Sequence, residues 1–147
     1  MMSLRAYRID QAALGELASA LAAEGLPVSD LGEPGRIFFR FEDGALAGYG
    51  GIESTGPERL LRSLVVVPGR RGAGLGSAML AALEREAVEL GVERLHLLTT
   101  TAAQFFRAHG YTDTARTNAP APIAASAEFT SLCPASATYL TKNLDSD

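Results

Sequence analysis

The chain has 147 residues, of which 47% are hydrophobic and 20% charged, and its formal net charge is −4. This length suits one domain that can bury its core without disulfides or metal, so we expect a single domain over residues 1–147. The acidic balance argues against nucleic acid as a partner, and the apolar runs are too short for the ~20 residues that cross a membrane.

The first half of the chain predicts one helix among strands that pair with their sequence neighbours. We expect, in order, a strand at 4–9, a helix from Asp10 to Gly25, a loop rich in proline and glycine, and strands at 36–42 and 45–53. Asp43 and Gly44 separate the last two strands, and an Asp-Gly pair between such runs is typical of a β-hairpin.

The second half predicts strands that alternate with helices. We expect a strand at 58–67, a helix after residue 76 that Gly91 ends, a strand at 94–99, a short helix at 102–109, and strands at 111–116 and 137–142. The order of elements predicts an α/β protein, with a mixed sheet that is antiparallel in its first half and has helices on both faces.

A glycine-rich turn between a buried strand and a helix is the most informative segment. The strand ends in the continuously apolar Leu64–Val67, as expected for a strand covered on both faces. Two arginines and three glycines follow closely: Arg70, Arg71, Gly72, Gly74 and Gly76. Because a helix N-terminus offers unpaired N–H groups and about half a positive charge, this pattern predicts a pyrophosphate site.

A turn without a ligand and a dinucleotide site both fit this pattern less well. Glycines can serve a tight turn alone, but three glycines with two arginines exceed what a turn needs. A dinucleotide-binding fold needs G-x-G-x-x-G and an acidic residue ~20 residues further on. Here the spacing is G-x-G-x-G, and the next strand ends in Leu97-Leu98-Thr99. The segment therefore fails both requirements of a dinucleotide site.

Two segments resemble the GNAT (general-control-related N-acetyltransferase) superfamily. Leu64–Pro68 followed by Arg71–Gly76 resembles its acetyl-CoA signature, and the pattern A-x-x-F-F-x-x-x-G-Y at 102–111 is similar to its second conserved block. The order of strands and helices matches the family over nearly the whole chain. The resemblance implies a GNAT-like acyl-CoA N-acyltransferase fold whose two central strands splay apart, with the thioester in the gap. It also implies acetyl-CoA as co-substrate and is compatible with a homodimer.

The same resemblance assigns residues to the cofactor. It implies that the pantetheine arm pairs with the backbone of Leu64, Val65 and Val66. It further implies that the pyrophosphate is held by the amides of Arg71, Gly72, Ala73, Gly74, Leu75, Gly76 and Ser77.

A narrower set of segments is similar to bacterial arsenic-resistance N-acetyltransferases. These are Leu60–Leu64, Leu97–Thr99, and the tail motifs at 119–120, 128–129 and 132–137. Members related to that group acetylate the amino group of arsenical or phosphorus analogues of glutamate. The resemblance therefore implies a small amino acid or such an analogue as acceptor.

Acetyl transfer to an amine needs a neutral nitrogen, a polarised carbonyl and a proton for the departing thiolate. Backbone N–H groups near Val65 and Val66 could polarise the carbonyl. Glu53 ends a strand beside the expected acetyl site and is our candidate base; the alternative is an exposed glutamate at a strand end. Many family members carry a tyrosine as acid where this chain has Phe106, so the acid is either another group or absent.

Arg62 and Arg116 are candidates for binding the acceptor. A charged residue in an otherwise apolar strand is costly unless it is paired, so Arg62 either pairs with an acidic neighbour or holds a substrate carboxylate in a bidentate fork. We favour the substrate role for Arg62. Arg116, in a later expected strand, is a weaker candidate whose alternative is a solvated position.

The remaining polar residues suggest little chemistry. Cys133 is the one cysteine, which excludes an internal disulfide, and with two scattered histidines it offers no metal cluster. We interpret Cys133 as a packing residue and His109 as a packed or capping residue, although a place near the cofactor is open to His109. His96 should point to the opposite sheet face from Leu95 and Leu97, and we assign it no role. The N-terminus lacks the apolar region of a signal peptide, so we expect a cytoplasmic protein.

Two other functions remain open on the same fold. One is a protein acetyltransferase acting on a lysine or an N-terminus, and the other is a non-catalytic acyl-CoA-binding module. Phe106 in place of tyrosine is the feature that favours the second.

Overall fold

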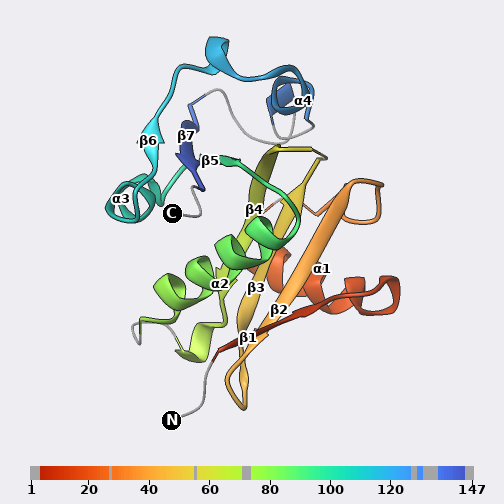
Figure 1. Cartoon of the computed structure of the whole chain (residues 1–147). Coiled ribbons are helices and arrows are strands. Elements are labelled where there is room, and N and C mark those ends of the chain that lie inside the picture. The colour runs from red at the N-terminus through yellow and green to blue at the C-terminus, as the bar shows by residue number, and fades with distance from the viewer. Residues whose placement is uncertain are drawn as a thin grey trace.

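The computed structural model describes residues 4–26, 28–54, 56–70, 74–126, 129–130 and 136–144. Seven strands form one mixed sheet in the order β1-β2-β3-β4-β5-β7-β6 (Figure 1). The strands are β1 (Arg5–Arg8), β2 (Arg36–Glu42), β3 (Leu46–Glu53), β4 (Glu58–Val66), β5 (Arg94–Thr99), β6 (Thr112–Asp113) and β7 (Thr138–Asn143). Neighbours pair antiparallel except β4 and β5, which are parallel. The predicted fold class is therefore confirmed.

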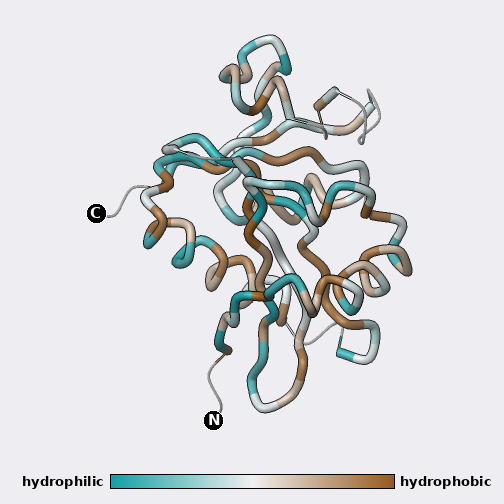
Figure 2. Tube along the Cα trace, turned by 90° about the vertical axis from the view of Figure 1, so that its right-hand side faces the viewer, coloured by the Kyte–Doolittle hydropathy of each residue, from teal (hydrophilic) through white to brown (hydrophobic). Residues whose placement is uncertain are grey.

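Helices cover both faces of the sheet. They are α1 (Leu14–Ala23), α2 (Leu75–Glu89), α3 (Ala103–Ala108) and α4 (Ala121–Ala124), with short 3-10 helices at Gln11–Ala13, Pro68–Arg70 and Arg116–Asn118. Figure 2 shows helical segments on either side of the strands, each alternating between hydrophobic and hydrophilic colours as amphipathic helices do. Within the described residues, no helix is long and apolar enough to span a membrane.

Two hydrophobic clusters lie on opposite faces of the sheet. The larger joins α2 and α3 to alternate residues of the strands, with Met79, Leu80 and Leu83 of α2 at its centre. The smaller packs Leu17 and Leu21 of α1 against the other face. The apolar faces of α1 and α2 therefore pack on opposite sides of the sheet.

Local signals placed several element ends correctly. Asp10 accepts a hydrogen bond from the Ala13 amide and so caps the turn that leads into α1. Gly25, with φ of 71°, follows the end of α1, and Leu26 N–H donates to the Leu21 carbonyl. β2 and β3 form the hairpin predicted around Asp43 and Gly44.

The region after α3 differs from the prediction. The strand expected at 111–116 is only Thr112–Asp113, because this edge strand has a single neighbour and pairs with β7 at two rungs. Arg116 instead begins a 3-10 helix, and the short α4 follows in a segment for which we predicted no element. Alanine is a strong helix former, and the proline of α4 stands in the first turn, where a missing N–H costs nothing.

Candidate active site

A gap opens between the two central strands. β4 and β5 pair at three successive rungs, and the last of them joins Leu60 to His96. Beyond this rung the two strands diverge, as Figure 1 shows. Parallel neighbours in a sheet usually stay paired along their length, so an early divergence creates space for another extended chain beside β4. The structure thus contains the splayed centre that the resemblance implied.

An extra residue in β4 lies at this gap. Tyr49 of β3 pairs with Val65, but Gly51 pairs with Arg62, so β4 has one residue more than β3 over this stretch. Ser63 takes a positive φ of 61°, which is uncommon for a residue with a side chain. A bulge of this kind turns backbone groups away from their ladder and changes their direction. Here it reorients the strand just before Leu64 and Val65.

Glycine in β3 permits the close approach of the bulged strand. A side chain at Gly48 would collide with the carbonyl oxygen of Val65, and its Cβ would lie 2.7 Å from Cε of Met79. The β3 backbone therefore supports the β4 stretch that the resemblance assigned to pantetheine.

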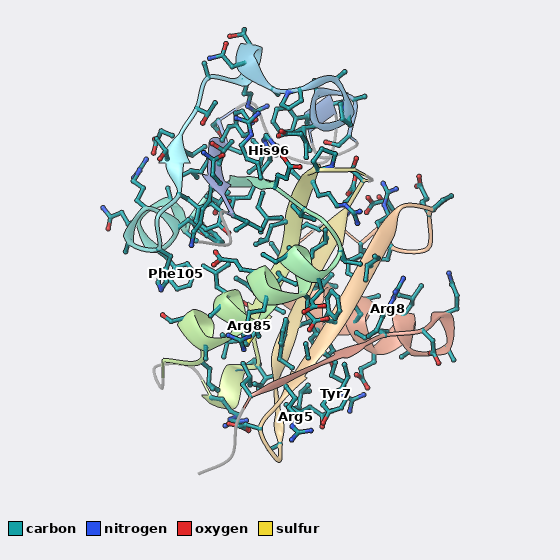
Figure 3. All side chains as sticks on the ribbon, viewed as in Figure 1. Arg5, Tyr7, Arg8, Arg85, His96 and Phe105 are labelled. Atoms are coloured by element: carbon teal, nitrogen blue, oxygen red, sulfur yellow. The ribbon has the colours of Figure 1, made fainter. Side chains whose placement is uncertain are left out.

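The N-terminus of α2 lies at the mouth of the gap. Gly74 caps the helix with φ of 75°, a left-handed conformation that favours glycine. A Cβ on Gly76 would lie 3.9 Å from Cγ2 of Val66 and 3.5 Å from the Phe105 ring, so the first turn of α2 passes between β4 and α3. Figure 3 shows Phe105 on the side of α3 toward α2. Leu75 and Ser77 belong to the same turn, whereas Arg71, Gly72 and Ala73 lie outside the described residues.

Two further side chains of this region have defined partners. The guanidinium of Arg70 donates to both carboxylate oxygens of Asp43 at 2.7 Å, so its charge is balanced within the protein. Arg70 therefore brings no unbalanced positive charge to the predicted pyrophosphate site. The Nδ1 atom of His109 is 2.7 Å from the Phe105 carbonyl, and its Nε2 atom is 2.9 Å from Oγ of Ser77. His109 is therefore the packed and capping residue at the end of α3 that the sequence predicted, and it also contacts Ser77 in the first turn of α2.

Four charged side chains meet on the sheet face away from α2. Arg62 donates from Nη1 to Glu53 and from Nη2 to Asp30, both at 2.9 Å. Arg36 donates to the same Asp30 carboxylate at 2.9 Å, and its Nη2 atom lies 3.5 Å from Oε2 of Glu53. Asp30 and Glu53 are each at most 4% exposed, and the Arg62 side chain is fully buried. We call these residues the ion-pair cluster.

The cluster changes the interpretation of two predicted site residues. Glu53 is not an exposed glutamate at a strand end, since it is buried and both of its oxygens face guanidinium groups. Its role as base stays a prediction. Arg62 pairs with acidic neighbours, which was the alternative to a substrate fork. Because Asp30 and Glu53 contact its terminal nitrogens, we expect the protein's own carboxylates, rather than a substrate carboxylate, to be the partners of Arg62.

Electrostatics stabilise the charged form of this cluster. Burial acts to raise the pKa of Asp30, but the hydrogen bonds and charges of Arg62 and Arg36 outweigh burial and hold the pKa below its ordinary value. Two carboxylates and two guanidiniums leave no net charge in the cluster. Its members are therefore mutual partners, as buried charges must be.

The remaining predicted residues lie elsewhere. The guanidinium of Arg116 donates to the Ala137 carbonyl at 3.2 Å and lies over the Phe129 ring. Its substrate role stays a prediction. Phe106 is 6% exposed and packs edge-on against Tyr111, so this position has neither a hydroxyl nor an open face. Cys133 lies outside the described residues.

Sequence reasoning missed three features of the site. Asp30 and Arg36 were not singled out, although a buried arginine in β4 was itself a signal that a carboxylate must be near. The bulge at Ser63 has no sequence signal that we recognise. His96, to which we assigned no role, is fully buried and hydrogen-bonded to Tyr139 and Glu58.

Comparisons with known proteins identify the family. Residues 6–111 match the model of the acetyltransferase (GNAT) family. Over 84 residues the chain is 40% identical to the mycothiol acetyltransferase of Nocardia farcinica, a match that covers 51% of this chain and 26% of that protein. The chain thus spans about a quarter of the curated relative that it matches.

Solved structures share the fold at low sequence identity. N-acetylglutamate synthase from Neisseria gonorrhoeae, complexed with coenzyme A and N-acetyl-glutamate, superposes with a TM-score of 0.77 at 16% identity, over 99% of this chain and 36% of that one. The ribosomal-protein-S18-alanine N-acetyltransferase of Escherichia coli superposes with a TM-score of 0.71 at 15% identity, over 98% and 96% of the two chains. Because the family model covers most of the sequence, from β1 to the residue before β6, this chain belongs to the acetyltransferase (GNAT) family.

Proposed function

We propose that this chain is an N-acetyltransferase that moves the acetyl group of acetyl-CoA to the amine of a small molecule. The observation that carries the proposal is the gap between β4 and β5, with the β4 bulge on one side and the N-terminus of α2 at its mouth. Such an arrangement offers an edge for an extended thioester arm and a positive helix end for a phosphate. The transfer is direct, within a ternary complex of protein, acetyl-CoA and amine.

The residues of the gap fit coenzyme A. The pantetheine arm would run beside Leu64–Val66, and the pyrophosphate would lie at Gly74–Ser77, together with Arg71–Ala73. Gly74 and Gly76 carry no side chain that would hinder a phosphate, and a Cβ on Gly74 would face open space. Acetyl-CoA supplies the activated acetyl group, and the protein has to orient the amine and handle its proton.

A small amine is the acceptor that the chain's features favour. The relative at 40% identity is named mycothiol acetyltransferase, after a small molecule rather than a protein. The narrower similarity of residues 60–64, 97–99 and 119–137 supports an amino acid or an arsenical or phosphinic glutamate analogue within this class. A protein acceptor is the alternative, since one structural neighbour is named for a ribosomal protein.

The proposal is tested by release of the CoA thiol, followed with a disulfide reagent. The acceptors are free amino acids, their phosphinic and arsenical analogues, amino sugars, and a lysine-containing and an alanine-terminated peptide. We expect acetyl-CoA to be consumed with a small amine. Efficient acetylation of a peptide, without acetylation of any small amine, would show that the acceptor is a protein. Saturable acetyl-CoA binding without transfer to any acceptor would indicate the non-catalytic module that Phe106 favours.

A further inference from the structure

A chain of hydrogen bonds crosses three strands beside the gap. The hydroxyl of Tyr139 on β7 lies 2.6 Å from Nδ1 of His96 on β5, and Nε2 of His96 lies 2.6 Å from Oε1 of Glu58 on β4. Arg94 donates to the same Glu58 oxygen at 2.8 Å. His96 is fully buried and Tyr139 is 3% exposed, whereas the Glu58 side chain is 28% exposed. We call Tyr139, His96 and Glu58 the triad.

The carboxylate fixes the tautomer of the histidine. An ionised Glu58 can only accept hydrogen bonds, so in the neutral ring Nε2 carries the hydrogen that faces it. Nδ1 then carries a lone pair and accepts the hydrogen of the Tyr139 hydroxyl. The phenol oxygen keeps its own lone pairs for a further donor. In this arrangement an adjacent base activates a hydroxyl, and a carboxylate in turn orients that base.

His96 and Tyr139 lie where the sheet opens, and Glu58 lies two rungs before this point. His96 belongs to the last rung that joins β4 to β5, and Tyr139 pairs with Leu98, two residues beyond His96 in β5. Leu95 and Leu97 face the cluster around α2, so His96 faces the opposite side, as predicted. Arg62 follows Leu60 by two residues in β4, so their side chains point to the same face of the sheet. Figure 3 shows His96 at the top of the sheet near β4, well separated from Arg85 of α2. The ion-pair cluster and the triad therefore share one face of the sheet.

We propose that Tyr139, acting with His96 and Glu58, accepts the proton of the attacking amine and returns it to the departing thiolate. This inference rests on the proposed function. The amine nitrogen forms a bond to the thioester carbon, and the carbonyl electron pair moves to oxygen. The N–H proton passes to the Tyr139 oxygen as the hydroxyl proton passes to Nδ1 of His96. When the carbonyl re-forms, the C–S bond breaks with its electron pair on sulfur, and the proton returns from Nδ1 through Tyr139 to that sulfur.

The charges around His96 suit this cycle. The groups that face the ring are Glu58 from β4, Arg94 from its own strand and Tyr139 from β7. Burial lowers the pKa of His96 and outweighs the opposing effect of Glu58, so the resting ring is neutral and can take a proton. Burial likewise raises the pKa of Tyr139, which keeps its hydroxyl protonated at rest. Glu58 then stabilises the transient imidazolium.

The triad also supplies the acid and base groups that Phe106 and Glu53 do not offer. Phe106 has no hydroxyl to protonate the thiolate, and the Glu53 oxygens are held by Arg62 and Arg36. In the triad the same proton serves both halves of the reaction, so no separate acid is required. Tyr139 is the catalytic residue of this proposal, and His96 and Glu58 are positioning residues that act through it.

Tyr139→Phe is the first test, with Tyr111→Phe as its matched control. Tyr111 is also 3% exposed, and its hydroxyl donates to the Glu84 carboxylate at 2.8 Å on the other face of the sheet. Both variants lose one buried hydroxyl that bonds to a side chain. We expect Tyr139→Phe to lower kcat ~10²–10⁴-fold, as for loss of general acid–base catalysis, with the acetyl-CoA Kd unchanged. Tyr111→Phe should keep kcat within about tenfold of the unmodified protein. Equal losses in both variants, or none in Tyr139→Phe, would overturn the proposal.

The pH profile separates catalysis from packing. The kcat of the unmodified protein should fall on the acid side as His96 gains a proton, with a midpoint below the ordinary value of about 6.5. Because Glu58 acts to raise the pKa of His96, Glu58→Gln should move this midpoint to lower pH. His96→Gln should remove this limb of the profile altogether. A limb that is identical in Glu58→Gln and in the unmodified protein would contradict the triad.

A measurement on the unmodified protein avoids any folding defect of the variants. Nitrogen NMR of the histidine rings should show His96 with its hydrogen on Nε2 at neutral pH. A hydrogen on Nδ1 would overturn the proposal whatever the variants do. Failure of the unmodified protein to acetylate any amine would contradict the proposed function itself, and this step with it, before a variant is made. Transfer by the unmodified protein with wild-type rates in Tyr139→Phe would contradict the triad alone.

Discussion

Oε1 of Glu53, at the end of β3, accepts a hydrogen bond of 2.9 Å from Nη1 of Arg62 in β4, and both side chains are buried. The two residues were predicted to act on different groups of one acceptor, Glu53 on its amine and Arg62 on its carboxylate. In the structure they are instead partners of each other, with Asp30 and Arg36 completing the set. This pairing has measurable consequences for both stability and activity.

Glu53→Gln distinguishes a base from an ion-pair partner. We expect it to lower the free energy of unfolding by about 1.5–3 kcal/mol, because a hydrogen bond between charged groups is lost. We expect kcat to stay within about tenfold, because our proposal passes the proton through Tyr139 in place of Glu53, the base predicted from the sequence. Urea unfolding and initial rates measure the two quantities. A ~10²–10⁴-fold loss of kcat at unchanged stability would instead establish Glu53 as the base.

Arg62→Met removes the charge at the centre of the cluster. Asp30 and Glu53 would lose their main partner inside the protein, and breaking a buried pair from one side typically costs about 3–5 kcal/mol. The loss in kcat/KM should be equal for an amino acid acceptor and for its decarboxylated amine, since Arg62 binds this protein's own carboxylates. A loss of kcat/KM confined to the acceptor that carries a carboxylate would show that Arg62 binds the substrate.

Asp30 should make the protein sensitive to acid. Its pKa is lowered in the folded state, so the unfolded chain takes up a proton at higher pH than the folded protein does. The stabilisation is therefore complete above the unfolded pKa of about 3.9 and is lost as the pH falls through the folded pKa. Urea unfolding from roughly pH 7 down to about pH 3 should show the free energy of unfolding begin to fall. In Asp30→Asn the free energy of unfolding should be lower at neutral pH and should change less with pH. An identical decline in Asp30→Asn would assign acid sensitivity to other carboxylates.

Gly74→Val tests the phosphate site, and Gly25→Val is its control. Both glycines have a positive φ, 75° and 71°, and a Cβ on either meets no atom within 4 Å. Each valine should therefore cost a similar ~1–2 kcal/mol of backbone strain. Calorimetry should show weakened acetyl-CoA binding in Gly74→Val alone, because Gly25 follows α1 on the other face of the sheet. Unchanged acetyl-CoA affinity in a folded Gly74→Val protein would contradict the placement of the pyrophosphate.

The sequence by itself determined the features that depend on neighbouring residues. Asp10 and Gly25 bound the first helical segment, Asp43-Gly44 gave the β2–β3 hairpin, and the residues around Gly74 predicted the turn into α2. Each of these is a local preference of backbone or side chain, so it can be recognised in a short stretch of sequence. The predicted length of the edge strand β6 was too great, because its length depends on its pairing with β7.

Only the tertiary structure decided how the charged residues are paired. Asp30 is 32 residues from Arg62, and Glu58, His96 and Tyr139 lie on three strands that meet through the sheet order β4-β5-β7. Their contacts depend on register, and the one-residue bulge at Ser63 changes that register within β4. A shift of one residue turns every following side chain to the other face of a sheet. Composition and spacing could therefore identify Arg62 and Glu53 as unusual, but the fold alone determines that they contact each other and that His96 contacts Tyr139.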